Sequence, residues 1–470
     1  IIPVDPVAPT TIGDYDNDTI PDLMVKFDRQ AVICLIPNCQ FTQEFATVSM
    51  SMRTYSDTNF WDDGYPSGGN YWSNYNGTDL YSGPNQNITG SDGIGDIPYT
   101  VDANNTDRFP LMRAYTLVQS TRYPWPMFHN NLRHTGYTES PAPATNTTQW
   151  TYTTGNAIWS SSPAVVDGKV YVGSYDRKVY CLDASTGVLV WNYITASAVD
   201  SSPAVVDGKV YIGSDDGKVY CLDAATGAHI WNYTTGSPVG SSPAVADGKV
   251  YVGSCDFKVY CLDALTGAHI WNYTTGNWVS SSPAIAYGKV YVGSNDNKVY
   301  CLDALTGAHI WNYTTGWMVE SSPAVADGKV YVGSCDFKVY CLDALTGAHI
   351  WNYTTGNWVS SSPAIAYGKV YVGSNDNKVY CLDALTGAHI WNYTTGNNVF
   401  SSPAVADGKV YVGSADWKVY CLDAATGAHI WNYTTGWPVT SSPAVADGMV
   451  FIGSRDSKVY AFGNVIRVPE

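Results

Sequence analysis

An eleven-residue phrase, Cys-Leu-Asp-Ala-x-Thr-Gly-x-x-x-Trp, recurs every 40 residues from Cys181 to Trp431. Each 40-residue unit also holds four short runs of β-forming residues, which in the second unit are residues 201–206, 209–214, 218–223 and 228–233. Asp207-Gly208, a turn at Asp216 and Thr226-Gly227 separate these runs, and such residues are typical of hairpin turns. This period therefore predicts the four-stranded antiparallel blades of a β-propeller.

The number of blades follows from counting the units. Ser-Ser-Pro-Ala begins eight units, at Ser161, Ser201, Ser241, Ser281, Ser321, Ser361, Ser401 and Ser441. Only seven complete phrases follow, because the eighth unit stops at Gly463. Residues 149–155, which contain Trp150, match the outer strand of the other units. We therefore expect an all-β, eight-bladed propeller in which 149–155 completes the last blade and removes an open edge.

The repeated phrase resembles the tryptophan-docking motif of pyrroloquinoline-quinone-like (quinoprotein-type) propellers. Asp223, Thr226, Gly227 and Trp231 match that motif, and Cys221 takes the place of its alanine. The resemblance implies that each indole stacks between adjacent blades. The structural docking residues would be Trp150, Trp191, Trp231, Trp271, Trp311, Trp351, Trp391 and Trp431.

Four regions follow from this assignment. They are a small, irregular β-rich N-terminal region (1–140), a Pro/Ala/Thr-rich linker (141–148), the propeller (149–463) and a tail (464–470). The segment Trp125-Pro-Met-Phe-His-Asn-Asn-Leu-Arg-His-Thr-Gly136 resembles the lead-in that precedes propellers of this class. His129 and His134 lie within it without a Cys or carboxylate triad, so packing explains them better than metal binding.

Acidic residues near the start of the chain suggest a calcium loop. Asp14, Asp16, Asp18 and Asp22 stand at relative positions one, three, five and nine, a spacing that wraps a hard cation. The pattern resembles the calcium loops of dockerin and thrombospondin type 3 repeats, but Thr19 replaces their usual glycine. The alternative is an acidic, solvated turn.

Residues 59–107 are dense in Gly, Asn, Asp and aromatics, which favour turns over helices. This segment resembles the one that closes right-handed β-helix surface proteins of methanogenic archaea, which indicates a source and a compartment but no activity. A second calcium site or an uncharged turn network would use Asp92, Asp96, Asp102, Asn104 and Asp107.

Charge and sequons bear on the compartment. A net charge of −16 disfavours nucleic acid and anionic membranes as partners, and no apolar run is long enough to span a bilayer. Glycosylation candidates are Asn17, Asn76, Asn87, Asn104, Asn146, Asn232, Asn272, Asn312, Asn352, Asn392 and Asn432. We expect an extracellular or cell-surface protein whose signal peptide has been removed.

The cysteines fit that compartment once their spacing is considered. Seven occupy equivalent repeat positions, too far apart for disulfides, and are expected to be small buried apolar residues. Cys34 and Cys39 are close enough in sequence to be a disulfide candidate.

The units differ mainly in the loop before Ser-Ser-Pro and in the turn around the invariant Asp. Strand alternation places both on one face of the propeller. The partner-binding face would carry Trp159, Trp278, Trp317, Trp358, Phe400, Trp417 and Trp437. Aromatics of this kind bind proteins or stack on sugars. The alternative is that they pack on the N-terminal region.

The resemblance raises a quinone-dependent dehydrogenase as one alternative function. Those enzymes hold quinone and calcium through nonequivalent Glu, Asn and Asp residues, and many have a disulfide between adjacent cysteines. Here the inner strands repeat Ser-Ser-Pro-Ala, and only Asp200, Glu320 and Asn398 differ near the channel mouth. No two cysteines are adjacent in the sequence. We therefore expect no quinone and no catalysis, with calcium as the cofactor.

The quinone-free relatives, which include the lipoprotein of the barrel-assembly machine, bind protein partners. The sequence accordingly favours a noncatalytic structural or protein-interaction scaffold, with a self-assembling layer, sheath or filament as one form. A carbohydrate-binding adhesion module is the other alternative. Partners would be other copies of the chain, cell-surface proteins or glycans.

The calcium loop yields a first prediction. If Asp14, Asp16, Asp18 and Asp22 bind calcium, chelation should lower the melting temperature, since a ligand at about 100 times its Kd stabilises by about 3 kcal/mol. Asp16→Ala should abolish the shift, whereas Asp28→Ala, outside the loop, should retain it. Differential scanning calorimetry with and without EGTA measures both, and an unchanged melt in the wild type would identify a solvated turn.

Overall fold

The computed structural model describes residues 123–463 and the backbone of seven short strands nearer the N-terminus. The chain divides into two units, Ile1–Tyr115 and Thr116–Glu470. In the first unit β1 (Thr11–Gly13), β2 (Asp22–Phe27) and β3 (Gln30–Cys34) form one antiparallel sheet. Two further pairs are β4 (Tyr81–Ser82) with β5 (Ile88–Thr89), and β6 (Tyr99–Asp102) with β7 (Asn105–Asp107).

Several candidate side chains of the first unit lie outside the residues whose side chains are described. They are the calcium candidates Asp14, Asp16, Asp18, Asp22, Asp92, Asp96, Asp102, Asn104 and Asp107, the sequons Asn17, Asn76, Asn87 and Asn104, and the pair Cys34 and Cys39.

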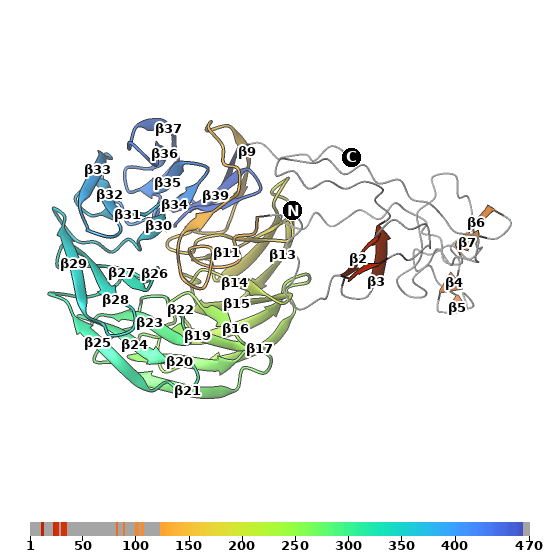
Figure 1. Cartoon of the computed structure of the whole chain (residues 1–470), viewed down its shortest axis with the longest axis horizontal. Coiled ribbons are helices and arrows are strands. Elements are labelled where there is room, and N and C mark those ends of the chain that lie inside the picture. Colours follow the sequence, from red (N-terminus) through yellow and green to blue (C-terminus); the bar gives the residue numbers. More distant parts are fainter. Residues whose placement is uncertain are drawn as a thin grey trace. The chain divides into compact units, whose positions relative to one another are not determined.

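The second unit is an eight-bladed propeller of four-stranded antiparallel blades, so the predicted fold class is confirmed (Figure 1). Blades 1 to 3 are β10 (Ala164–Val166), β11 (Lys169–Ser174), β12 (Lys178–Asp183), β13 (Leu189–Ile194); β14 (Ala204–Val206), β15 (Lys209–Ser214), β16 (Lys218–Asp223), β17 (His229–Thr234); and β18 (Ala244–Ala246), β19 (Lys249–Gly253), β20 (Lys258–Asp263), β21 (His269–Thr274). Blades 4 to 6 are β22 (Ala284–Ala286), β23 (Lys289–Ser294), β24 (Lys298–Asp303), β25 (His309–Thr314); β26 (Ala324–Ala326), β27 (Lys329–Ser334), β28 (Lys338–Asp343), β29 (His349–Thr354); and β30 (Ala364–Ala366), β31 (Lys369–Ser374), β32 (Lys378–Asp383), β33 (His389–Thr394).

Blade 7 is β34 (Ala404–Ala406), β35 (Lys409–Ser414), β36 (Lys418–Asp423) and β37 (His429–Thr434), and the short strand β8 (Tyr137–Thr138) runs parallel to β34. Blade 8 is β38 (Ala444–Ala446), β39 (Met449–Ser454), β40 (Lys458–Gly463) and β9 (Thr148–Thr153). Because β9 comes from the start of the propeller and β40 from its end, their pairing closes the ring, with Trp150 opposite Ala461.

An indole at each blade boundary packs on the next blade. A Cβ placed on Gly267 would lie 2.6 Å from the Trp231 ring, so only glycine leaves room for this contact. The Trp231 Nε1 donates to the carbonyl of Ala264 at 3.1 Å, and the Tyr211 hydroxyl donates to the same oxygen. All eight indoles are buried, with 6–8% of their surface exposed.

The two boundaries of blade 8 use different groups. Blade 8 ends before the Asp-Ala-x-Thr-Gly turn, so no alanine carbonyl is available to Trp431. Instead, Trp431 Nε1 and the Tyr411 hydroxyl both donate to the Pro143 carbonyl, at 3.4 and 2.7 Å. At the other boundary Trp150 Nε1 donates to Ala184, but Phe451 stands where other blades have the tyrosine hydroxyl. Residues 141–148, expected to be a linker, thus contribute to closure.

The packing at Gly187 yields a second prediction. Gly187 and Gly208 both have positive φ, but a Cβ at Gly187 would lie 2.6 Å from Trp150 while one at Gly208 meets nothing within 4 Å. Gly208→Ala should cost about 1 kcal/mol of unfolding free energy, the left-handed penalty alone. Gly187→Ala should cost about 2 kcal/mol more, because the indole must move. Urea unfolding compares them, and equal losses would show that the indole contact adds nothing.

Candidate binding face and central cavity

The lead-in segment closes one end of the central channel. Backbone carbonyls of Trp125, Pro126, Leu132, Arg133, Thr135 and Gly136 accept hydrogen bonds from the inner strands of blades 1, 2, 4, 5, 6 and 7. The donors are the amides of Val165, Val205, Ile285, Val325, Ile365 and Val405, at 2.7–2.8 Å. One short segment therefore ties six blades together, and its Phe128 forms part of the lining of the channel cavity.

The two histidines of this segment are structural. His129 and His134 are buried, and burial lowers the pKa of His129 to about 4 and that of His134 to about 3, so both are neutral near pH 7. His134 Nδ1 lies 3.2 Å from the Pro323 carbonyl oxygen, and Phe128 stacks on His129. No cluster of three metal-ligating side chains occurs among the described residues.

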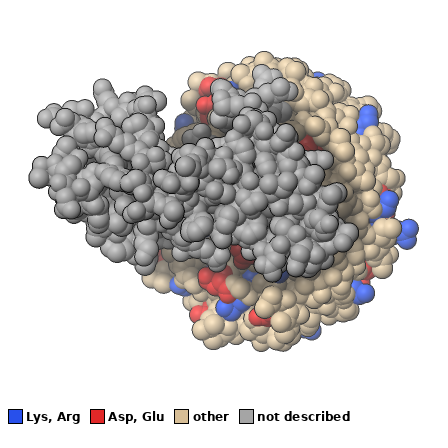
Figure 2. Space-filling view, turned by 90° about the vertical axis from the view of Figure 1, so that its right-hand side faces the viewer, with Lys and Arg blue, Asp and Glu red and all other residues tan. Residues whose placement is uncertain are grey.

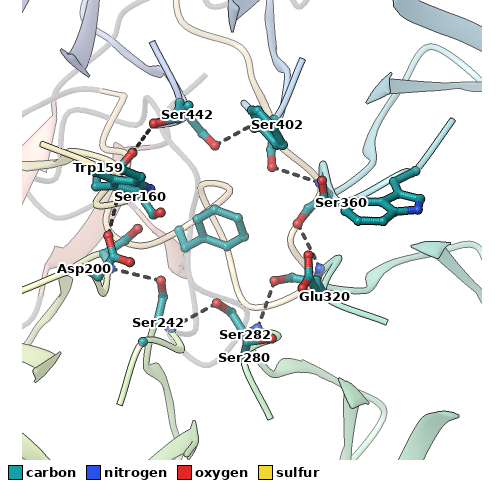
Figure 3. A pocket seen from close by; sticks show the side chains of 18 of the residues that line it. Trp159, Ser160, Asp200, Ser242, Ser280, Ser282, Glu320, Ser360, Ser402 and Ser442 are labelled. Carbon is teal, nitrogen blue, oxygen red and sulfur yellow. Dashed lines mark hydrogen bonds between the residues drawn. The ribbon is translucent and has the colours of Figure 1, made fainter. Parts of the chain in front are cut away.

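The repeated Ser-Ser pair builds the channel wall. The first serine accepts a hydrogen bond within its blade, as Ser201 Oγ does from Gly213 N–H at 3.1 Å. The second accepts one from the preceding blade, as Ser242 Oγ does from Ser202 N–H at 3.0 Å. The second contact recurs at all eight boundaries and closes when Ser442 N–H donates to Ser162 Oγ. Figure 3 shows two of these contacts, between Ser242 and Ser282 and between Ser402 and Ser442. These hydrogen bonds join neighbouring blades, so the repeated serine sequence of the inner strands is explained by closure of the ring.

A cavity of about 330 Å³ lies in the channel, with Phe128 of the lead-in segment among its lining residues. Seven of the second serines line it, together with Ser160, Ser280 and Ser360 from the preceding loops (Figure 3). Trp159, Trp358 and Phe400 also line it, as do Asp200 and Glu320, whereas Asn398 is not among the lining residues. The wall is therefore a ring of hydroxyls interrupted by aromatic and acidic side chains.

The most varied part of this wall lies near the junction of blades 8, 1 and 2. The Arg455 guanidinium lies 3.5 Å from the centre of the Trp159 ring, and its Nε donates to Thr440 Oγ1 at 3.0 Å. Asp200 Oδ1 accepts the Ser160 N–H at 2.9 Å. Burial, and secondarily the nearby Asp215 carboxylate, raises the pKa of Asp200 to about 6.

Glu320 lies in the wall of the same cavity (Figure 3). Desolvation raises the pKa of its carboxyl group above the ordinary value. The sequence placed Asp200 and Glu320 at the channel mouth, but it gave no sign that either pKa is perturbed, since that depends on the groups that surround each carboxyl in the closed ring. A perturbed carboxyl in a cavity is a feature shared by catalytic sites and by sites for cationic ligands.

The face on which the repeats differ, called the varied face below, is rich in exposed aromatics. Trp159, Trp278, Trp317, Trp358, Trp417 and Trp437 expose 38–60% of their surface, and Phe400 is half-buried. Trp317 contacts Trp358 edge-on and Trp417 stacks on Trp437, each pair with ring centres 6.2 Å apart. These four rings form two apolar platforms beside the cavity.

The opposite face is built from the repeated turns. Leu265, Leu305, Leu345 and Leu385 occupy equivalent turns of blades 3 to 6 and are 67–69% exposed. Among the described residues whose atoms are visible in Figure 2, lysines and arginines are scattered.

The repeat cysteines and sequons have distinct locations. Cys181, Cys221 and their five equivalents are fully buried free thiols, and burial raises the pKa of Cys221 to about 12. Asn232, Asn272, Asn312, Asn352 and Asn392 are exposed on the outermost strands, and Asn432 is half-buried. Asn146 is exposed. Among the described residues, no helix has the length and apolar character needed to cross a bilayer.

The residues of the cavity do not fit a quinone bearing three carboxylates. Arg455 is the only Lys or Arg among the described lining residues, and its guanidinium is already placed over Trp159. Asp200 and Glu320 add negative charge to the same wall. An anionic cofactor would therefore meet two carboxylates and one engaged cation.

Comparisons with known proteins show what the propeller is similar to. A family model described as outer membrane protein assembly factor BamB matches residues 139–238 and 215–318, and one described as the β-propeller of a β-alanine-activating enzyme matches residues 279–466. A comparison with curated proteins gives no match. The matched family models do not extend to residues 59–107, whose resemblance to methanogen surface proteins remains a sequence-based expectation.

Solved structures with the same fold include two dehydrogenases and BamB. A europium-containing methanol dehydrogenase has a TM-score of 0.65 at 16% identity, covering 73% of this chain and 98% of its own. BamB from Moraxella catarrhalis has a TM-score of 0.60 at 20% identity, covering 68% and 99%. Quinohemoprotein alcohol dehydrogenase from Comamonas testosteroni has a TM-score of 0.65 at 18% identity, and the match covers 74% of this chain and 82% of the dehydrogenase. At these identities the likeness establishes the fold alone.

Asp200 yields a third prediction. Folding raises its pKa from 3.8 to about 6, so its contribution to stability is complete below about pH 4 and is lost as the pH rises through 6. Asp200→Asn keeps an oxygen acceptor for Ser160 N–H and removes the charge. The variant should be more stable than the wild type at pH 7, by on the order of 2 kcal/mol, and by much less at pH 4.

Urea unfolding at the two pH values measures this difference. Asp207→Asn, at an exposed position on the opposite face, controls for the change in net charge. An Asp200→Asn effect of the same size at both pH values would contradict the raised pKa.

Proposed function

We propose that this pyrroloquinoline-quinone-like propeller is a noncatalytic scaffold that binds a partner through its varied face. The observation that carries the proposal is the contrast between a channel wall whose serines are engaged in closing the ring and a face with four paired, exposed tryptophans. Large exposed aromatics are the residues that most often anchor protein interfaces. Among the described residues, the exposed tryptophans lie where the repeats differ.

The similarity to BamB, an assembly factor by its description, supports a binding role for this architecture. We place the protein outside the cell, because its sequons are numerous and six of them lie on the described propeller rim. Calcium bound by the N-terminal acidic loops belongs to the same proposal. A self-assembling layer, sheath or filament is the structural form of this function.

A carbohydrate-binding adhesion module is the second candidate. The platform of Trp417 and Trp437 stacks two flat rings beside a cavity lined with hydroxyls, and sugars bind to such surfaces through their apolar faces and hydroxyl groups. A dehydrogenase has less support, because the cavity residues do not suit an anionic quinone.

A fourth prediction tests the varied face. Trp417→Ser/Trp437→Ser should weaken partner binding at least tenfold, because each aromatic anchor contributes about 1–2 kcal/mol. Leu305→Ser/Leu345→Ser, two exposed leucines of the opposite face, is the matched control and should leave binding unchanged. Cross-linking of the purified variants to envelope proteins, followed by mass spectrometry, compares the same partner across all three chains.

The outcomes separate the candidates. A partner bound equally by the tryptophan variant would refute binding through this face. Retention of the wild type, but not of the tryptophan variant, on immobilised neutral polysaccharides would favour the adhesion module. Stoichiometric retention of pyrroloquinoline quinone with alcohol-dependent dye reduction would overturn the noncatalytic assignment.

A further inference from the structure

The outermost strand of blade 1 differs from those of six other blades. In blades 2 to 7 this strand has the sequence His-Ile-Trp-Asn-Tyr-Thr, whereas β13 has Leu-Val-Trp-Asn-Tyr-Ile. Its sheet has the order β10-β11-β12-β13, so the far edge of β13 has no neighbouring strand in the described propeller. Polar residues at both ends of the strand are thus replaced by apolar ones on an unpaired edge.

The replacements are exposed. Val188, Leu189, Val190 and Ile194 expose 63, 37, 45 and 61% of their surface. In blades 2 to 7 only the isoleucine equivalent to Val190 is both apolar and large at these positions, with 38–41% exposed. No charged residue occurs from Val188 to Ala196. Blade 1 therefore presents an uncharged rim whose exposed side chains from Val188 to Ile194 are apolar except for Asn192.

In blades 2 to 7, polar side chains at the same positions protect the edge of the outermost strand. Asn232 Nδ2 donates to His229 Nε2 at 2.8 Å, and this polar pair recurs in every one of these blades. Thr234 completes an Asn-Tyr-Thr sequon, and a glycan on Asn232 would stand over the edge. In blade 1, Ile194 removes the sequon of Asn192 and adds apolar surface at once.

The β-bulge, which can also protect the edge of a sheet, does not set β13 apart from the other outermost strands. The register shift beside the outermost strand occurs in all eight blades, so the bulge gives β13 no special protection or exposure. In blade 8, β9 exposes Gln149, Thr151 and Thr153, which are polar. Among the eight described blades, β13 is the edge on which Asn192 is the single exposed polar side chain, and uncovered edges pair with other strands.

We propose that β13 is a self-association edge, through which two copies of this chain pair antiparallel about a twofold axis into a closed dimer. Identical strands related by a twofold axis oppose the same stretch, so apolar side chains meet apolar side chains. Each copy carries a net charge of −16, and the stretch from Val188 to Ala196 brings no charged group into the contact. One such edge per propeller stops the assembly at two. The edge lies on the outer rim and is independent of the varied face.

Light scattering of the full chain, prepared without N-glycans over a range of concentrations, tests this dimer. The wild type should approach twice the 51.0 kDa of one chain as concentration rises. Ile194→Lys should give a monomer, because the antiparallel pair sets residue 194 of each copy against the apolar start of its partner's stretch, where burying an unpaired ammonium group is costly. The matched control Ile310→Lys, on the corresponding strand of blade 4 and 40% exposed, should remain dimeric.

Ile194→Thr guards against a folding defect, since it installs the residue found in six other blades. It should retain the wild-type circular dichroism spectrum and raise the dimer dissociation constant at least tenfold. A monomeric wild type at every concentration overturns the proposal, and is the result expected if another segment or a foreign strand covers the edge. A dimer that survives Ile194→Lys, or that is lost in Ile310→Lys, also overturns it.

Transplanting the edge gives an independent test. His349→Leu/Ile350→Val/Thr354→Ile gives blade 5, across the ring, the sequence of β13. With two self-pairing edges per chain, the protein should form open chains larger than dimers. A variant that remains a dimer would show that this strand sequence does not drive self-pairing.

Discussion

The packing of an indole on a glycine of the next blade is the contact on which the propeller depends. The glycine must adopt a positive φ and must lack a Cβ, since an added Cβ would lie about 2.6 Å from the ring. The indole N–H then reaches an alanine carbonyl that also accepts a tyrosine hydroxyl. Each blade contacts mainly its neighbours, so ring stability rests on repeating this contact at seven of the eight boundaries, with Trp431 packed against Phe462 at the eighth.

Closure required departures from the repeat. At one boundary of blade 8, Pro143 supplies the carbonyl that a complete phrase would have supplied, and at the other a phenylalanine replaces the tyrosine. The serine ring and the lead-in segment then join blades that are distant in sequence, as in the hydrogen bond from Ser442 to Ser162. These contacts occupy the inner strands, and most of the differences between blades lie in the loops around the cavity mouth and in the outermost strand of blade 1. The exposed tryptophans of the varied face are in the first of these places.

Much of the fold was predictable, because the 40-residue period encodes a local unit that is repeated. Strand limits, turns, blade number and the location of Asp200 and Glu320 follow from reading one unit and counting the copies. The role of Pro143 was not predictable, since a Pro/Ala/Thr-rich stretch has the composition of a linker and its contact with Trp431 spans 288 residues. Asn398 was expected near the channel mouth with the two carboxylates, yet it is not in the cavity wall.

The sequence by itself determined the four-stranded blade, its repetition and the positions at which blades differ, because hairpins and strand alternation depend on neighbours in the chain. Only the tertiary structure decided which groups the closed ring brings together. It placed Arg455 over Trp159, buried Asp200 enough to raise its pKa to about 6, and left β13 as an apolar edge. These properties depend on burial and on distances between separate blades, and neither is encoded in the spacing of residues within one repeat.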